Sequence, residues 1–328
     1  MLLAYTCFAV RMLRGGDIFR TDAAALDPET FRTLCCRFGA RGAQIDLSQL
    51  PLDEPRTLAA VREAFDAHAL EIELSIPSRY LETEEAYGQA AGAAAALGAT
   101  RARVGLLYGR RYESFGTRAE FEAFTAGWRG TLARMRRVFE RHPLAIGIEN
   151  HKDWLAAELV SLLREIDCAK LGVCLDFGNN LSLLEDPDET IEQLAPFAIT
   201  THLKDMAVAG TVDGFEMAEV PLGEGQLPLE RYVSIVRRER PDVRFTLEMI
   251  TRDPLPVPYR TERYWTAFDA EARHPERVRR FEARVLAQAR KDPLFRATGL
   301  TTEEQIEAED RHVAASADYA ARVLGLPV

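Results

Sequence analysis

The sequence predicts an α/β fold, a closed (β/α)8 TIM barrel with a helical C-terminal extension. Two observations predict it. Short apolar runs alternate with longer amphipathic segments up to about residue 250, which is typical of parallel strands joined by helices. Four of the later runs each end in a single side chain that can bind a metal, as expected where the ends of parallel strands open into a site.

The expected strands are short apolar runs bounded by polar or turn residues. In order, they occupy residues 2–10, 42–47, 70–76, 101–107, 146–149, 171–176, 198–202 and 243–248. The expected helices between them occupy residues 28–38, 54–68, 82–97, 118–141, 154–166, 186–194 and 229–238. Asp27 and Pro28 mark the start of the first helix, because aspartate caps a helix and proline fits its first turn. With a C-terminal helix after the last strand, the chain contains eight strand–helix units, the number that closes a barrel.

The chain continues beyond the last expected strand. Residues 252–259 contain three prolines, and we expect a loop without regular structure there. Two charged helices are expected at residues 271–291 and 302–324. The second is opened by the capping signature Thr301-Thr-Glu-Glu304.

No long linker separates this tail from the barrel. We therefore expect one domain over residues 1–328, with the barrel at about 1–250 and the extension at about 260–328 covering the barrel's flank or a neighbouring subunit. An open doubly wound sheet is the main alternative fold. It would carry a glycine-rich phosphate loop after the first strand, whereas Gly15 and Gly16 come late and do not form the GxGxxG pattern.

The composition excludes several classes of function. The 328 residues are 47% hydrophobic and 28% charged, as in ordinary folded proteins, but the net charge of −10 argues against a nucleic-acid partner, which requires a basic surface. No apolar stretch reaches the roughly 20 residues of a membrane span, and the apolar start lacks the basic segment of a signal peptide. The five cysteines form no CxxC pair and lie in apolar contexts, so we expect reduced thiols in the cytoplasm.

Four expected strands end in a side chain that can bind a metal: Glu149, Asp176, His202 and Glu248. In a parallel barrel these strand ends meet on one face, so the four side chains become neighbours. Three carboxylates packed together repel one another unless a cation lies between them. Three carboxylates and one imidazole suit Mn²⁺ or Mg²⁺, and Co²⁺ or Zn²⁺ are compatible. The alternative is that each residue separately caps a helix or forms an ion pair.

Five short motifs carry a resemblance to a known family. They are Ile148-Glu-Asn-His151, Cys174-Leu-Asp-Phe-Gly-Asn179, Thr201-His-Leu-Lys-Asp205, Val220-Pro-Leu-Gly-Glu-Gly225 and Leu247-Glu248. Over roughly three-quarters of its length, the chain resembles the xylose isomerase-like TIM-barrel superfamily of sugar isomerases and epimerases. That superfamily includes enzymes like D-tagatose 3-epimerase and hydroxypyruvate isomerase, inosose dehydratases, and lyases that act on keto-sugars.

The resemblance implies that the four strand-end residues bind the metal and that Glu149 and Glu248 also transfer protons. A metal that holds a carbonyl and the adjacent hydroxyl acidifies the C–H bond and stabilises an enediolate, while carboxylates remove and return the proton. Isomerisation, epimerisation, dehydration and decarboxylation can all pass through such an intermediate. We expect an isomerase or epimerase of a small sugar, keto-sugar or sugar acid. The alternative is a lyase: a decarboxylase, a dehydratase or a C-glycoside deglycosidase.

Two positions depart from the epimerase pattern that the resemblance implies. Asn179 stands where such epimerases place a histidine near the substrate, and Val208 stands where they place an arginine. An activity like that of D-tagatose 3-epimerase on a free ketohexose is therefore not expected. Asn179 stays a candidate substrate-binding residue.

Two further residues are candidate catalytic acids or bases. His151 follows Glu149 by two positions, and Lys204 follows His202 by two, so each lies on the same side of its strand as a metal-ligand candidate. The alternatives are a loop histidine that caps a helix and an ion pair between Lys204 and Asp205.

Arginines follow several of the expected strands and would surround the active face of an otherwise acidic protein. Guanidinium groups recognise carboxylate or phosphate, so they indicate an anionic substrate; solvated loop residues are the alternative. The candidates are Arg11, Arg14, Arg79, Arg110 and Arg111.

Two other functions are disfavoured. A phosphodiesterase like the apurinic endonucleases shares the barrel but needs more histidines, and only His151 and His202 of the six end expected strands. A non-catalytic sugar-binding or assembly subunit would have no need for all four ligand candidates. We expect a small-molecule partner and no nucleic acid or membrane; a homo-oligomer is compatible with the sequence.

Overall fold

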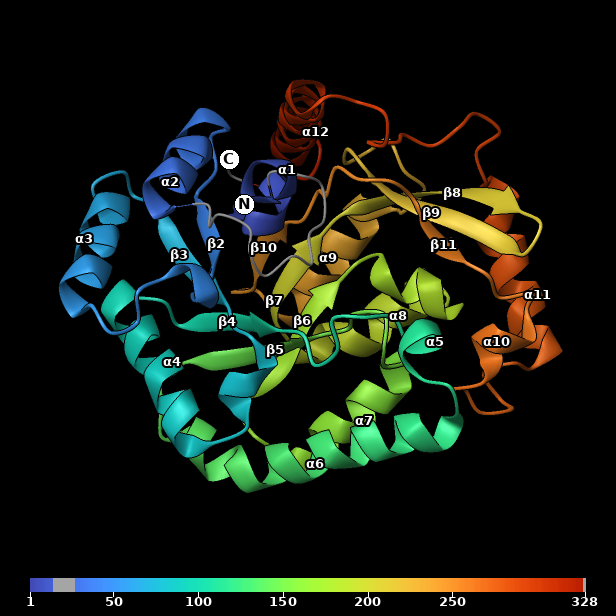
Figure 1. Ribbon diagram of the computed structural model, residues 1–328, viewed down its shortest axis with the longest axis horizontal. Coiled ribbons are helices and arrows are strands. Elements are labelled where there is room, and N and C mark those ends of the chain that lie inside the picture. Colours follow the sequence, from blue (N-terminus) through green and yellow to red (C-terminus); the bar gives the residue numbers. More distant parts are fainter. Residues whose placement is uncertain (14–26, 327–328) are drawn as a thin grey trace.

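Eight parallel strands close into a barrel in the computed structural model, which describes residues 1–13 and 27–326 (Figure 1). Their order around the barrel is β1-β10-β7-β6-β5-β4-β3-β2. The strands are β1 (Leu2–Ala4), β2 (Gly42–Asp46), β3 (Glu71–Ser75), β4 (Arg101–Val104), β5 (Ala145–Glu149), β6 (Leu171–Asp176), β7 (Ala198–Leu203) and β10 (Arg244–Leu247). The predicted (β/α)8 barrel is therefore confirmed.

Helices surround the strands on the outside (Figure 1). They are α2 (Pro28–Arg37), α3 (Pro55–Asp66), α4 (Glu84–Leu97), α5 (Arg111–Ser114), α6 (Arg118–Glu140), α7 (Ala156–Ile166), α8 (Pro187–Leu194) and α9 (Leu229–Glu239). Local sequence sets their ends: the Asp27 carboxylate accepts hydrogen bonds from the first turn of α2, and Gly98, at φ +70°, ends α4. None of the described helices is long and apolar enough to cross a membrane.

The first strand is shorter than expected. The apolar run predicted as a strand over residues 2–10 forms β1, then a 3₁₀ turn at Tyr5–Phe8 and the short helix α1 at Ala9–Leu13. Periodicity cannot separate a strand from a buried helix in a continuous apolar run, and residues 7–10 are buried in either case. The early end of β1 places Thr6 at the carboxyl face of the barrel, where its hydroxyl donates to Glu248 (3.1 Å).

A second, antiparallel sheet was not predicted. It contains β8 (Asp205–Thr211), β9 (Gly214–Val220) and β11 (Leu255–Val257), and it lies beside the barrel near α11 (Figure 1). The expectation of an irregular loop over residues 252–259 was therefore wrong. Pro256 fits β11 because this is an edge strand, where a missing N–H costs no ladder hydrogen bond.

The C-terminal segment forms α10 (Glu262–Trp265), α11 (Pro275–Arg284) and α12 (Thr302–Arg322). Helix α11 is shorter at both ends than the helix expected at residues 271–291. It begins at Pro275, which fits a first turn, and it ends at Arg284, before a 3₁₀ turn at Leu286–Gln288. The predicted capping signature is confirmed: Thr301 accepts from the Glu304 N–H, and the Glu304 side chain bonds back to the N–H of Thr301. Helix α12 packs beside α1 (Figure 1).

Candidate metal centre

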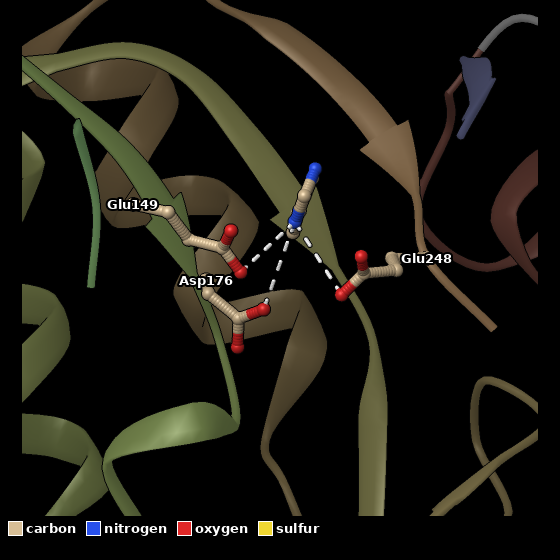
Figure 2. Close-up of side chains that lie close together, drawn as sticks. Glu149, Asp176 and Glu248 are labelled. Atoms are coloured by element: carbon tan, nitrogen blue, oxygen red, sulfur yellow. Dashed lines mark hydrogen bonds and ion pairs between the residues drawn. The ribbon is translucent and has the colours of Figure 1, made fainter. Parts of the chain in front are cut away.

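Four side chains at the carboxyl ends of barrel strands meet in one place. Glu149 ends β5, Asp176 ends β6, His202 lies near the end of β7 and Glu248 directly follows β10. Each offers a ligand atom within 4.8 Å of the others, and all four are buried. Figure 2 shows the three carboxylates arranged around one imidazole. We call these four residues the acidic cluster.

His202 presents one nitrogen to the three carboxylates. Its Nδ1 atom lies 3.3 Å from Glu149, 3.8 Å from Asp176 and 3.4 Å from Glu248. Its Nε2 atom lies 3.0 Å from Oε1 of Gln44, whose amide nitrogen donates to Glu73 (2.7 Å). Because the amide oxygen of Gln44 faces the ring, Nε2 carries a proton. Burial would lower the pKa of His202, but Cys174, Glu248 and Glu149 raise it well above the usual value, so Nδ1 also carries a proton until a metal ion displaces it. The bond to Gln44 therefore leaves Nδ1 as the nitrogen that a metal can bind.

The two oxygens of the Asp176 carboxylate have different surroundings. Its Oδ1 accepts the backbone N–H groups of Gly178 (2.9 Å) and Asn179 (2.8 Å), which fixes the carboxylate. Its Oδ2 is buried without a hydrogen-bond donor of good geometry, although the Lys204 ammonium lies 2.8 Å away. A divalent metal ion fits this set of ligands: the Oδ2 atom of Asp176, the Nδ1 atom of the neighbouring imidazole and the two glutamate carboxylates. The acidic cluster can therefore bind a metal.

Two buried cations also contact the acidic cluster. Arg103 on β4 donates through Nε to Glu149 (2.5 Å) and through Nη1 to Ser75 (3.2 Å). Lys204 lies 2.5 Å from Glu248. Burial alone would raise the pKa of both glutamates, but it is outweighed by Arg103 and His202 at Glu149 and by His202 and Lys204 at Glu248. Both pKa values are held well below the usual range, so both carboxylates are ionised.

The chain's similarity to known proteins agrees with this geometry. Residues 21–269 match the family model of xylose isomerase-like TIM barrels. This chain belongs to that family. Solved structures with the same fold include a D-psicose 3-epimerase (TM-score 0.63, 12% identity), which covers 99% of both chains. A xylose isomerase-like TIM barrel protein from Mycobacterium smegmatis in complex with magnesium has a TM-score of 0.57 and 14% identity, covering 83% of this chain and 97% of its own.

Two curated proteins from this comparison are similar over shorter segments. A 3-oxo-isoapionate decarboxylase from Pectobacterium atrosepticum is 33% identical over 149 residues, which is 44% of this chain and 52% of that protein. The uncharacterised protein YihM from Escherichia coli is 28% identical over 99 residues, 30% of each chain. The chain thus matches about half the length of the first relative and less than a third of the second.

In this family member, the candidate catalytic residues lie in different surroundings. Lys204 contacts Asp176 and Glu248 of the acidic cluster. The alternative of an ion pair with Asp205 is wrong, because the Asp205 carboxylate instead accepts four backbone N–H groups, those of residues 206, 223, 225 and 227. His151 is partly exposed, and its Nε2 lies 3.5 Å from the Lys152 ammonium. Among the residues that the structure describes, its Nδ1 has no hydrogen-bond partner. Asn179 donates to Glu149 (2.9 Å).

The predicted arginines are engaged elsewhere. Arg11 pairs with Glu309 and Asp310 on α12 (2.6 Å each), and the buried Arg111 pairs with Glu158 (2.9 Å). The other described candidates have partners within their own loops: Arg110 pairs with Glu113, and Arg79 lies over the Tyr80 ring. Arg14 lies outside the described residues. In the described part of the chain, none of these guanidinium groups is hydrogen-bonded to the acidic cluster, so their role in substrate binding stays a prediction without a contact to support it.

Several residues near the acidic cluster were missed by sequence reasoning. Each is a charged or amide side chain inside a strand or loop, where its own position in the chain gives no sign of its partner. One signal was available: a charged residue in the middle of a buried strand, as at Arg103 and Glu73, needs a partner inside the barrel. The missed residues are Gln44, Glu73, Arg103, Lys152, Glu219 and Arg252.

Proposed function

We propose that this protein is a divalent-metal-dependent lyase that decarboxylates a small keto-sugar acid. The observation that carries the proposal is that both glutamates of the acidic cluster are paired with a buried cation, Glu149 with Arg103 and Glu248 with Lys204. A carboxylate held ionised in this way is a weak base. Removing a proton from carbon, the first step of isomerisation, is therefore poorly supported, whereas loss of CO₂ needs no base.

The residues of this chain supply what a decarboxylation requires. When bound, a metal ion would supply a Lewis acid that polarises the carbonyl β to the departing carboxylate, on the carbon next to the one that carries this carboxylate. As the C–C bond to CO₂ breaks, its electron pair moves onto the carbonyl oxygen, and Lys204 lies where a positive charge would stabilise that oxygen. The carbanionic carbon must then receive one proton. Lys152 is the nearby group that would donate it, because burial lowers its pKa to about 8, whereas burial and the charge of Lys152 lower the pKa of the neighbouring His151 well below its usual value and keep that ring neutral.

The ligand set favours particular metals. Three carboxylate oxygens and one imidazole nitrogen form a mostly oxygen-based site, which suits Mn²⁺ or Mg²⁺ and is compatible with Co²⁺ or Zn²⁺. The relative that is a 3-oxo-isoapionate decarboxylase supports the reaction class, since it is 33% identical over the matched segment.

An isomerase or epimerase is the second candidate, and one observation favours it. Glu149 and Glu248 lie on opposite sides of the imidazole in Figure 2, as a pair that removes a proton on one face and returns it on the other would. In that reaction the pairing with Arg103 and Lys204 would have to loosen when substrate binds.

Mass balance in D₂O separates the two candidates. Enzyme loaded with Mn²⁺ is incubated with candidate keto-sugar acids, and the product is analysed by mass spectrometry. Loss of CO₂ with one deuterium bound to carbon in its place supports the lyase, whereas replacement of one carbon-bound hydrogen by deuterium with every other atom kept supports the isomerase. Turnover that persists after complete removal of metal would contradict both candidates.

A further inference from the structure

A buried ammonium group near the acidic cluster has no carboxylate partner. Lys152 is 4% exposed, and its Nζ atom lies 2.6 Å from Oδ1 of Asn179 and 3.5 Å from Nε2 of His151. Within residues 1–13 and 27–326, no carboxylate oxygen forms an ion pair with it. Burying a charge without a counter-ion is costly, so such a group indicates a ligand that completes the pair.

Asn179 places this ammonium one side chain away from the candidate metal ligands. Its Oδ1 accepts from Lys152, and its Nδ2 donates to Oε1 of Glu149 (2.9 Å). Both ends of the amide are used, so its orientation is fixed. A small molecule held by the acidic cluster could therefore extend a second group towards Lys152.

Four buried basic side chains accompany the carboxylates of the site. Ion pairs join Arg103, Lys204 and Arg252 to the carboxylates, and Asn179 links Lys152 to Glu149. The carboxylates are Glu149, Asp176, Glu219 and Glu248. A divalent ion would add two positive charges to this network, and an anionic ligand would offset them.

Lysine is a rare residue in this chain, and two lysines lie at this site. Only four of its 41 basic residues are lysines, and two of them, Lys152 and Lys204, are buried at this site. Arginine, which serves nearly everywhere else, is always charged and has a rigid fork, whereas lysine is a compact charge that can also give up its proton. Burial, and then the charges of Lys204 and Arg252, lower the pKa of Lys152 to about 8. The side chain is therefore still mostly charged at neutral pH.

We propose that Lys152 binds the carboxylate of the substrate and so selects an anionic sugar derivative over its neutral counterpart. This inference rests on the proposed function, because it names the side chain that binds the part of the substrate lying beyond the acidic cluster. The carboxylate would accept hydrogen bonds from the ammonium in place of the missing counter-ion, and Asn179 would keep the ammonium aimed at it.

Equilibrium binding tests the proposal without depending on turnover. The Mn²⁺-loaded protein is titrated calorimetrically with D-ribonate and with ribitol, which differ only in the carboxylate at C1. Unmodified protein should prefer D-ribonate. Lys152→Met should weaken D-ribonate binding about 10- to 100-fold, as expected for a lost charge-assisted hydrogen bond in a buried site, and leave ribitol binding within about twofold. Lys291→Met, which changes an exposed lysine, is the matched control and should alter neither affinity.

The outcomes separate this inference from the proposed function. Failure of the unmodified protein to bind Mn²⁺ would contradict the proposed function itself. Normal Mn²⁺ binding with equal weakening of both ligands in Lys152→Met would show a merely structural lysine and overturn the inference alone. Lys152→Arg, which keeps the charge, should keep a preference for D-ribonate; loss of that preference would also count against the carboxylate contact.

Discussion

A single hydrogen bond decides which nitrogen of His202 can bind a metal. Gln44 accepts the Nε2 proton, and Gln44 is itself held by Glu73, which also accepts from the Thr200 hydroxyl (2.8 Å). We predict that Gln44→Met lowers the affinity for Mn²⁺ about 10- to 100-fold, because the ring loses the partner that fixes its tautomer. Calorimetric titration with Mn²⁺ measures this.

The matched control for that variant is Gln288→Met, which changes an exposed glutamine whose side-chain amide donates to the backbone carbonyl of Arg284. Its affinity for Mn²⁺ should equal that of the unmodified protein. If Gln44→Met also binds Mn²⁺ normally, the hydrogen bond from His202 to Gln44 does not control the ring.

The buried charge of Lys152 should reduce stability. The pKa of Lys152 falls from 10.5 to about 8 on folding, so its charged form is disfavoured in the folded state by on the order of 3 kcal/mol. We predict that Lys152→Met stabilises the metal-free protein at pH 7 by about 1–3 kcal/mol, since the lost hydrogen bond to Asn179 offsets part of the gain.

The pH dependence of this effect has a definite sign. Between pH 8 and 10.5 the unfolded state binds more protons at Lys152 than the folded state, so the stability of the unmodified protein should rise with pH in this window. The advantage of Lys152→Met should therefore shrink from pH 8 to 10.5. Urea unfolding of both proteins at pH 7, 8, 9 and 10 checks this; an advantage independent of pH would contradict it.

The residues that could be predicted from the sequence are those that end strands. Glu149 and Asp176 each follow an apolar run, and the barrel rule brings such residues together whatever their spacing. Arg103 and Gln44 lie inside strands, and their partners depend on the register between strands, which no local pattern encodes. The partners of Arg11 lie about 300 residues away on α12, so the sequence could not show that its charge is already used.

One aspartate organises the loop between β9 and α9. The Asp205 carboxylate accepts the backbone N–H groups of Met206 (2.8 Å), Gly223 (3.0 Å), Gly225 (2.9 Å) and Leu227 (3.1 Å). A Cβ atom at Gly225 would lie 2.0 Å from the Asp205 Oδ1. This explains why His-Leu-Lys-Asp205 and Pro-Leu-Gly-Glu-Gly225 occur together: the first motif ends in the acceptor that holds the second.

We predict that Asp205→Asn lowers the free energy of unfolding by about 1–3 kcal/mol. The amide NH₂ would face N–H donors, leaving buried groups unsatisfied. Chemical denaturation measures the loss. Asp213→Asn, in the exposed turn between β8 and β9, is the matched control and should change stability by less than about 0.5 kcal/mol. An Asp205→Asn variant as stable as the control would mean that the loop does not depend on this carboxylate.

The strands of the antiparallel sheet were not predicted from the sequence. Strands β8 and β9 join through a short turn at Thr211–Gly214, and Asp213-Gly214 between apolar runs is a hairpin signal that the sequence contains. The long helices were placed well because their caps and apolar periodicity agree, as at Thr117 and Glu120 in α6. Strand β11 was missed because Pro256 is compatible with a strand only at the edge of a sheet.

Over the whole molecule, α12 connects the segments that follow several barrel strands. Glu309 accepts the backbone N–H of Val10 (2.8 Å) and pairs with Arg11, while the Ser316 hydroxyl accepts the N–H of Leu222 (3.2 Å). His312 lies 2.9 Å from the Thr251 hydroxyl. The C-terminal extension therefore supports the carboxyl face of the barrel, from which the acidic cluster is built.

We predict that Glu309→Gln raises the free energy of unfolding at pH 8 by about 1–2 kcal/mol. Burial outweighs the ion pair with Arg11 and raises the pKa of Glu309 to about 7, so ionising this side chain in the folded state has a cost that the neutral glutamine avoids, and the lost pair with Arg11 offsets part of the gain. Denaturation measures the effect, with Glu307→Gln on the exposed side of α12 as the control. The gain should shrink as the pH falls from 7 to 4.5, where Glu309 is protonated in the folded protein; a gain independent of pH would contradict this prediction.

The pairing of β1 with β10 also sets the order of events when the chain folds. Leu2 pairs with Thr246 and Leu3 with Leu247, and the Cys7 thiol bonds to the Leu247 carbonyl across 240 residues. We expect contacts this distant in the chain to form late, because closing so long a loop costs entropy before any pairing is gained. Glu248 reaches the other three residues of the acidic cluster only when this seam closes. A metal ion bound there should therefore slow the unfolding of a finished barrel more than it speeds the folding of a nascent chain.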